Sequence, residues 1–384
     1  MSSSTSNTPH PYEISIGERR IGPALPVLVI AEAGTSHMGD TGHARELIDA
    51  AAESGADCIK FQWVIADEIV HRSAGNITLP GGSIPIWERF RQLERPASFY
   101  AELKEYTEKH GLLFLCSPFG TESARQLLDL KVEAVKIASP ELNHYPLLKA
   151  TAKSPLLLST GVSSLGDIER SIDYVRSLNN ETPARCRNAL LHCITAYPAP
   201  EEEYNLRLIP LLSRIFGLPV GVSDHSRDPL LVPLLAVSQG ACIVEKHFTL
   251  SRKNQGLDDP IALVPEEFSS MCRQIRKGEN IPSGQLIEYC RSMFSPDRVS
   301  SVLGNGRKSL APSEVPFYRS TNRSVVALTD LAVGSIISSE NTALLRSEQN
   351  RRPGVGAHHW KSVIGAALKK PVTAGDGISW DTLL

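Results

Sequence analysis

Residues 27–62 read VLVIAEAGTSHMGDTGHARELIDAAAESGADCIKFQ, and this stretch decides the fold. It opens and closes with short apolar runs, at 27–32 and 57–62, and an amphipathic helix pattern lies between them at 43–55. Runs that are apolar throughout are typical of strands buried on both faces of a parallel sheet. The stretch therefore predicts a strand, a covering helix and a second, parallel strand.

The same alternation continues along the chain. Further apolar runs lie at 112–117, 134–139, 156–160, 189–193, 219–223 and 241–248. Further helix patterns lie at 98–111, 121–131, 145–153, 164–178, 205–216, 228–239 and 265–277. Eight strand–helix units in about 250 residues predict an α/β fold, a closed (β/α)8 TIM barrel. An open doubly wound sheet is the alternative, and the lack of a GxGxxG motif after the first run argues against it.

Other parts of the chain have different patterns. Residues 1–12 are rich in Ser, Thr and Pro and are expected to form a disordered tail before a barrel at 13–280. Residues 64–97 are too long for a simple connection and predict an excursion over the barrel mouth. A Gly- and Pro-containing linker is expected at 281–321, and a small β-rich domain at 322–384.

Composition narrows the class of protein. The chain has 40 Lys and Arg against 42 Asp and Glu, so it is not basic overall, and we expect no nucleic-acid partner. No apolar run approaches the ~20 residues that span a bilayer, and the first residues lack a signal-peptide pattern. The seven cysteines are an odd number and include no CxxC pair, which favours free thiols in a reducing cytoplasm.

Polar residues end the apolar runs, and in a barrel the functional site lies where strands end. These residues are Glu32, Lys60, Gln62, Ser117, Lys136, Ser139, Glu141, Ser159, Thr160, His192, Ser223, Asp224, His225, Lys246 and His247. We expect Lys60 and Lys136 to bind an anion in the mouth with Ser117, Ser139, Ser159 and Ser223, since hydroxyls and an ammonium suit a phosphate. The alternative is that each lysine pairs with a barrel carboxylate such as Glu32 or Glu141.

Two histidines end neighbouring runs and are candidate metal ligands. His225 and His247 offer imidazole nitrogens that suit a divalent ion, and Glu32 or Asp224 could join them. Two histidines are not a full ligand set, so waters or substrate would complete it. The alternative is a pair of hydrogen-bonded core histidines.

The successive motifs resemble those of the N-acetylneuraminate (sialic acid) synthase family. They are VIAEAGTSHMGD, GADCIKFQ, FLCSPFG, VKIASPELNHYPLL, LLLSTGVSSLGDIE, LLHCITAYPAP, VGVSDHSRDP and VEKHFTLSRKNQGLDDPIALVPEEF, spanning 27–268. Residues 323–384 resemble the antifreeze-like (SAF) domain that these synthases carry. The order of the motifs and the matching tail are specific for the family, and far less so for the substrate.

The resemblance implies a metal-dependent condensation of phosphoenolpyruvate with N-acetylmannosamine or a related diacetamido sugar, giving a nonulosonic acid and phosphate. It implies Mn²⁺ at His225 and His247, with Mg²⁺ or Co²⁺ as other possibilities. It assigns phosphoenolpyruvate to Lys60, Ser117, Lys136, Ser139, Ser159, Thr195 and Ser223, and the sugar to Gln62, Tyr197, Asp258 and Arg352. Glu32 and Glu141 match the catalytic acids, and Arg352 would reach the barrel of a partner subunit in a domain-swapped homodimer.

Some residues depart from the family pattern. Ser36-His37-Met38 stands where the family has Asn-His-Asn or similar, and Pro140 replaces a glycine after Ser139. These departures leave the identity of the sugar open. Two other functions also stay open: a barrel aldolase or isomerase in which Lys60 or Lys136 forms a Schiff base, and a carbohydrate-binding protein without activity.

Overall fold

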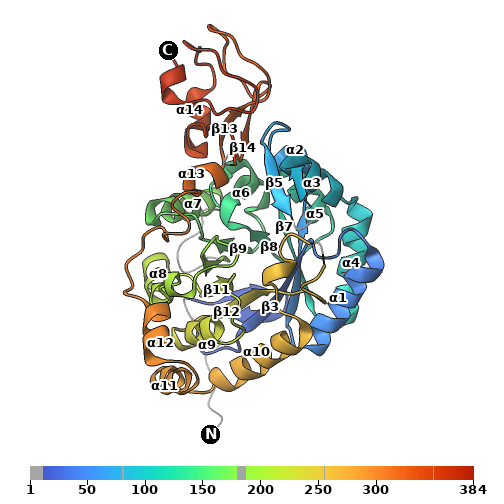
Figure 1. Ribbon diagram of the computed structural model, residues 1–384, viewed down its shortest axis with the longest axis vertical. Helices are drawn as coiled ribbons and strands as arrows, with labels where there is room; N and C mark the ends of the chain where they lie inside the picture. The colour runs from blue at the N-terminus through green and yellow to red at the C-terminus, as the bar shows by residue number, and fades with distance from the viewer. Residues whose placement is uncertain (1–11, 80–81, 180–186, 255, 349) are drawn as a thin grey trace.

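The computed structural model describes residues 12–79, 82–179, 187–254, 256–348 and 350–384. Its centre is a parallel sheet of eight strands (Figure 1). These are β3 (Leu28–Gly34), β4 (Cys58–Trp63), β7 (Leu113–Pro118), β8 (Val135–Ile137), β9 (Leu156–Ser159), β10 (Ala189–Cys193), β11 (Val220–Asp224) and β12 (Ile243–His247). The last strand, β12, pairs with the first, β3, and β7 lies beside β8 without a ladder between them in the described chain. The sheet is therefore a nearly closed barrel, which confirms the predicted fold and excludes the open sheet.

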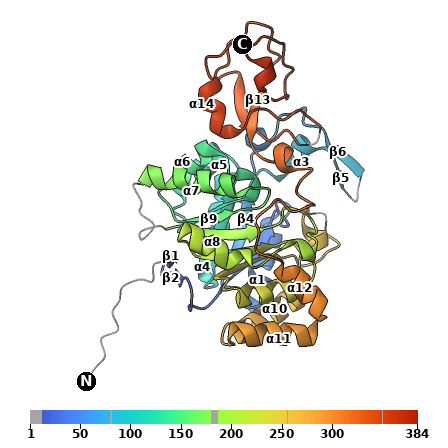
Figure 2. The ribbon, with the colours of Figure 1, turned by 90° about the vertical axis from the view of Figure 1, so that its left-hand side faces the viewer.

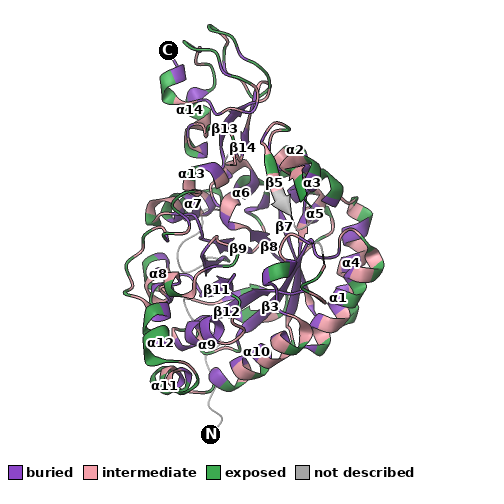
Figure 3. Cartoon of the chain, in the orientation of Figure 1, coloured by how far each residue is buried: buried purple, intermediate pink, exposed green. Residues whose placement is uncertain are grey.

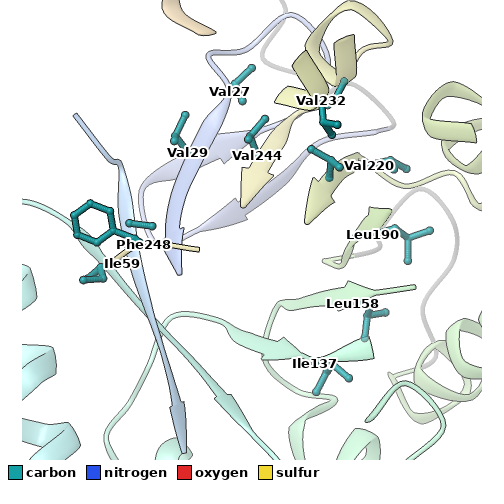
Figure 4. Close-up of a cluster of buried hydrophobic side chains, with 14 of the residues drawn as sticks. Val27, Val29, Ile59, Ile137, Leu158, Leu190, Val220, Val232, Val244 and Phe248 are labelled. Carbon is teal, nitrogen blue, oxygen red and sulfur yellow. The ribbon is translucent and has the colours of Figure 1, made fainter. Parts of the chain in front are cut away.

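Helices surround the barrel, each lying within three residues of the predicted position at both ends. They are α1 (Thr41–Glu53), α4 (Ala97–Lys109), α5 (Thr121–Asp129), α6 (Tyr145–Thr151), α7 (Leu165–Asn179), α8 (Leu208–Phe216), α9 (Leu231–Ser238) and α10 (Pro265–Gly278). Their inner faces pack on strand residues that point outward, such as Val29, Ile59 and Val244 (Figure 4). The helices are exposed on the outside and the strands are buried (Figure 3).

The other face of each strand fills the barrel interior. Leu28, Ile30, Leu115, Leu157 and Leu191 form a separate apolar core there. A hairpin of β1 (Ile14–Ile16) and β2 (Arg19–Ile21) adds isoleucines to that core at the amino ends of the strands. Side chains alternate between the two faces of a strand. The next inward-pointing residue of each strand therefore lies two positions further along, closer to the mouth at the carboxyl end of the barrel.

The excursion at 64–97 has structure of its own. It contains α2 (Ala66–Ile69), the antiparallel strands β5 (Asn76–Leu79) and β6 (Gly82–Pro85), and α3 (Ile86–Leu93). It lies at the carboxyl end of the barrel on the side of the small domain (Figures 1 and 2).

The expected linker at 281–321 differs from expectation in its first half. Residues there form α11 (Ser283–Met293) and α12 (Pro296–Leu303), and Cys290, Val299 and Val302 belong to the outer core of the barrel. These two helices are therefore part of the barrel domain. Extended chain with the short helix α13 (Tyr318–Thr321) leads on to the small domain.

Residues 1–11 of the expected tail lie outside the described residues. The carboxyl-terminal domain contacts loops at the mouth end of the barrel (Figure 1). It contains β13 (Ser324–Ala327), β14 (Thr342–Leu345), α14 (Trp360–Val363), η5 (Ala357–His359) and η6 (Trp380–Thr382), around a core of its own. Short 3-10 helices η1 (Ser139–Glu141), η3 (Glu201–Glu203) and η4 (Asp259–Ile261) lie in barrel loops. Within the described ranges, no helix is long and apolar enough to cross a membrane.

Candidate functional site at the barrel mouth

Polar side chains converge inside the barrel above its apolar core. The lysine cluster comprises the deeper ones, namely Lys60, Ser117, Lys136, Ser159, Ser223 and Glu245. In the histidine cluster, Gln62, His225 and His247 lie two residues further along the chain than Lys60, Ser223 and Glu245, and Tyr197 and Asp258 join them from the loops after β10 and β12. Glu32 contacts both clusters, because its Oε2 lies 2.6 Å from Lys60 Nζ and its Oε1 accepts from Gln62 Nε2 at 2.8 Å.

Glu245 organises the lysine cluster, and the sequence analysis missed it. Its Oε2 lies 3.8 Å from Lys60 Nζ, and its Oε1 lies 3.7 Å from Lys136 Nζ and accepts from Ser223 Oγ at 2.8 Å. Burial opposes the ionised form of Glu245, but Lys136 and Lys60 lower its pKa to about 2. The signal was present in IVEKH, where strict alternation places residues 245 and 247 on one face.

The two lysines are buried and surrounded by hydroxyls. Lys60 Nζ lies 3.3 Å from Ser117 Oγ, and Lys136 Nζ lies 2.7 Å from Ser159 Oγ. Burial disfavours the charge on Lys60, but Glu245 and Glu32 raise its pKa, so it is cationic. Burial also lowers the pKa of Lys136. The lysines face the interior with serines around them and also have carboxylate neighbours, Glu32 and Glu245, so the alternative of carboxylate pairing is confirmed for Lys60, whereas anion binding stays a prediction.

Lys246 and Asp224 lie on the opposite face of their strands from the site. Lys246 Nζ lies 2.6 Å from Asp224 Oδ2 and donates to the carbonyl oxygens of Ser226 and Asp228. Asp224 is thus committed to a buried ion pair, which contradicts the expectation that it could join a metal site. The pair instead holds the loop that follows β11 and begins with His225.

Ser139 and Thr195 meet on the other side of the mouth. Ser139 Oγ accepts from Gly161 N at 3.0 Å, and a Cβ added to Gly161 would lie 2.1 Å from Thr195 Oγ1 and 2.9 Å from Ser139 Oγ. In the described part of the chain, Thr195 Oγ1 is buried without a hydrogen-bond partner. Pro140, the departure after Ser139, lies in the first turn of η1, where a missing N–H is tolerated.

The histidine pair has the geometry of a partial metal site. The ring centroids of His225 and His247 lie 5.2 Å apart. His225 Nδ1 donates to the Ile194 carbonyl at 2.8 Å, which leaves Nε2 for a ligand. Burial and then His225 lower the pKa of His247 to about 3, so its ring is neutral. Burial opposes the charge on His225, but the neighbouring Cys193 thiol raises its pKa.

Two imidazoles fit a divalent ion whose other ligands are water or substrate. Among the described residues, no group of three or more His, Cys, Asp or Glu side chains could hold a metal ion. The positions implied for the sugar surround this pair. Tyr197 stacks on His225 with ring centroids 4.3 Å apart, and Asp258 Oδ2 lies 3.8 Å from His247 Nδ1. Tyr197 is 53% exposed, so the histidine cluster opens to solvent.

Glu141 and Arg352, two further expected site residues, lie away from both clusters. Glu141 is fully buried between Arg323 Nε and Arg346 Nη2, each 2.6 Å away, at the junction with the small domain. Burial raises its pKa, but the two guanidinium groups outweigh burial and hold the pKa well below its usual range. Glu141 is therefore an ion-pair partner of two arginines at this junction, and its catalytic role, by proton transfer or by stabilising positive charge, stays a prediction. Arg352 is half-exposed and pairs with Asp381 within its own domain.

Fold and site together define a (β/α)8-barrel protein with buried lysines and paired histidines at the carboxyl ends of its strands. The NeuB family model matches residues 47–285 and the SAF domain model matches residues 322–384, so this chain belongs to the NeuB family and carries an SAF domain.

Its relatives include named synthases. The chain is 32% identical to an N,N'-diacetyllegionaminic acid synthase of Legionella pneumophila, covering 94% of this chain and 95% of that one. It is 31% identical to the N-acetylneuraminate-9-phosphate synthase of Homo sapiens, covering 86% of each. The crystal structure of the spore coat polysaccharide biosynthesis protein spsE of Bacillus subtilis matches with a TM-score of 0.80 and 33% identity, over 97% of this chain and 99% of that one.

Proposed function

We propose that this protein condenses phosphoenolpyruvate with N-acetylmannosamine or a related diacetamido sugar, giving a nonulosonic acid and phosphate. C3 of phosphoenolpyruvate forms a bond to the aldehyde carbon of the open-chain sugar, and the aldehyde oxygen takes a proton. Water adds at C2, and the bond from C2 to the phosphate oxygen breaks. We place the reaction in the cytoplasm, as the free cysteines suggest.

The observation that carries the proposal is the lysine cluster. Two buried lysine amino groups and three serine hydroxyls lie together above the apolar core of the barrel, and in the described chain the buried hydroxyl of Thr195 has no hydrogen-bond partner. Such a set supplies the donors that a phosphate and a carboxylate need together. We assign the phosphate to Lys60 and the hydroxyls, including Ser139 Oγ, and the carboxylate to Lys136.

The histidine cluster suits the second substrate. His225 and His247 would hold a divalent metal, Mn²⁺ for preference, which when bound would polarise the aldehyde oxygen. Gln62, Tyr197 and Asp258 surround these histidines and offer hydrogen-bonding groups for sugar hydroxyls. The sugar would then lie directly above phosphoenolpyruvate, with the reacting carbons between the two clusters.

Glu32 is placed between the clusters and is the candidate base. Its contacts with Lys60 and Gln62 fix the carboxylate where water would approach C2. We assign Glu32 to accept the proton of that water. Glu141 would act only at a distance, by the field of its charge. Arg352 would contact the N-acetyl group of a sugar bound in the barrel of a partner subunit.

Phosphate release tests the proposal. Purified protein is mixed with phosphoenolpyruvate, Mn²⁺ and one sugar at a time: N-acetylmannosamine, its 6-phosphate or a diacetamido-trideoxyhexose. We expect release with one of these sugars and none without sugar. His225→Ala should abolish both release and Mn²⁺ binding measured by electron paramagnetic resonance, whereas His110→Ala on the surface should change neither. Folded protein that releases no phosphate with any of the three would refute the proposal.

A Schiff-base aldolase would behave differently. Borohydride added with substrate would trap an imine on Lys60 or Lys136 in such an enzyme. We expect no trapping at either lysine. Glu245 and Glu32 raise the pKa of Lys60 and keep it cationic, whereas burial lowers the pKa of Lys136, so Lys136 is the stricter test. A mass increase on either lysine would favour the aldolase.

A further inference from the structure

The chain between the barrel and the SAF domain runs along one side of the barrel, past α8 to α13, and bonds to loops at the rim of the mouth (Figure 1). We call residues 311–323 the strap. Asn322 Nδ2 donates to the Val162 carbonyl at 3.1 Å, and the Arg323 N–H donates to Asn143 Oδ1 at 3.1 Å. Figure 2 shows this segment running from the α12 end of the barrel to β13. The strap thus contacts the loops after β8 and β9 before it enters the SAF domain.

Glu314 of the strap bonds to the barrel loops through its carboxylate. Its side chain is fully buried, and its Oε1 accepts from Val162 N at 2.7 Å and from Thr195 N at 2.8 Å. Its Oε2 accepts from Ala311 N at 3.2 Å within the strap itself. One carboxylate oxygen therefore joins the loop after β9 to the loop after β10.

The joined loops carry groups of the phosphoenolpyruvate site. Ser159 ends β9, and Thr195 lies two residues after β10. Their loops meet at Gly161, where an added Cβ would lie 2.1 Å from Thr195 Oγ1 and 3.2 Å from Glu314 Oε1. The Glu314 carboxylate and the Thr195 hydroxyl therefore both lie close to Gly161, and Glu314 holds the Thr195 backbone N–H directly.

The backbone at Val162 also depends on this contact. Val162 has a φ of 43°, in the left-handed region that β-branched residues avoid. Its N–H is held by Glu314 and its carbonyl by Asn322, so both bonds that stabilise this conformation come from the strap. Without Glu314, two buried N–H groups would lose a charged acceptor, and the loop would relax.

We infer that Glu314 is a positioning residue for phosphoenolpyruvate: it sets the spacing between Ser159 and Thr195 from outside the barrel. The inference rests on the proposed function. It makes the segment before the SAF domain part of the anion site, although no strap side chain belongs to the lysine cluster. Its effect should fall on the binding of phosphoenolpyruvate and leave the sugar, held by the histidine cluster, unaffected.

Three substitutions of Glu314 separate reach from charge. Glu314→Ala removes both bonds, Glu314→Asp keeps the charge but shortens the reach, and Glu314→Gln keeps an oxygen that can accept from both N–H groups. Ser313→Ala is the matched control, because Ser313 donates to Glu203, at the far end of the loop after β10, rather than to Val162 or Thr195. Calorimetric titration of full-length protein with inorganic phosphate and with phosphoenolpyruvate, without sugar, gives the affinities.

We expect Glu314→Ala and Glu314→Asp to lower the affinity for inorganic phosphate and for phosphoenolpyruvate about tenfold or more. A tenfold loss corresponds to about 1.4 kcal/mol of binding free energy. Glu314→Gln should recover much of the loss, and Ser313→Ala should match the wild type. The KM for the sugar should change less than about twofold. If Glu314→Ala does not fold, as judged by thermal unfolding, the Asp variant decides. Wild-type affinity in a folded Ala or Asp variant would overturn the inference, whereas failure of the wild type to bind either anion would overturn the proposed function.

Discussion

Glu141 Oε2 lies 2.6 Å from Arg323 Nε, and both side chains are completely buried where the barrel meets the SAF domain. Arg323 also donates to the carbonyl oxygens of Ile69, Phe119 and Leu344. One guanidinium therefore ties the excursion, a barrel loop and the small domain to a single carboxylate. A buried charge with this many partners is costly to disrupt from either side.

Glu141→Gln should lower the free energy of unfolding by about 3 to 5 kcal/mol, because it leaves two arginines without their counter-charge. Thermal unfolding measures the loss. Glu122→Gln, which breaks an exposed ion pair with Arg125, should leave the midpoint unchanged. An unchanged midpoint in Glu141→Gln as well would mean that the junction does not depend on this charge.

The stability difference between wild type and Glu141→Gln should depend on pH. The folded-state pKa of Glu141 is depressed by the two arginines, so its contribution is complete above the unfolded-state value of about 4.5. The contribution is lost as the pH falls below that value toward the folded-state pKa. Unfolding experiments between pH 7 and pH 3 should show the two proteins converging at the acid end, and a constant gap would contradict the assignment.

Lys136→Met should raise the KM for phosphoenolpyruvate by about thirtyfold or more, since loss of a buried charged contact costs about 2 kcal/mol or more. The KM for the sugar should hold steady, because Lys136 lies in the lysine cluster. Steady-state kinetics with each substrate varied in turn separates the two constants. Lys149→Met on α6 is the control, and equal rises in both KM values would argue against a carboxylate at Lys136.

Lys246→Met should weaken Mn²⁺ binding, although Lys246 itself lies outside the proposed metal site. The substitution leaves Asp224 buried without its partner and frees the carbonyl oxygens of Ser226 and Asp228, so the loop beginning at His225 loses its anchor. The double variant Lys246→Met/Asp224→Asn should be more stable than Lys246→Met alone, because it removes the unpaired charge. Metal titration and thermal unfolding of the three proteins test this, and intact Mn²⁺ affinity in Lys246→Met would show that the pair does not position His225.

Arg352→Ala should raise the KM for the sugar more than that for phosphoenolpyruvate, and Arg351→Ala, one position away, should not. If Arg352 acts on a partner subunit, mixing Arg352→Ala with His225→Ala should restore activity. The mixed dimer would then hold one complete site, formed by an intact barrel and an intact arginine from different chains. No restoration after refolding the two together would place Arg352 in its own barrel or outside the reaction.

The sequence alone predicts the barrel because its strands are uniformly apolar and each ends in a polar residue. Glu245 was missed because only the last residues of the run, Lys246 and His247, were taken as candidates. Side chains of a strand alternate between faces, so Glu245 and His247 share the inward face and Lys246 points outward. Helices α11 and α12 were missed because Gly- and Pro-containing stretches flank them, at GENIPSG and GNG. Glu314 could not be found from local pattern, since its partners Val162 and Thr195 lie more than a hundred residues away along the chain.

The hairpin of β1 and β2 covers the amino end of the barrel. Among the described residues, Ile14, Ile16 and Ile21 pack into the interior core there, so the two proposed substrates would enter, and their products would leave, by the mouth. Lys60 and Glu245 lie two strand residues below Gln62 and His247, about 6 to 7 Å deeper. A sugar seated at the histidines would block the way to the lysines, so binding should follow a compulsory order with phosphoenolpyruvate first. Dead-end inhibition by a sugar analogue should then be uncompetitive with respect to phosphoenolpyruvate, and a competitive pattern would contradict a single-entrance barrel.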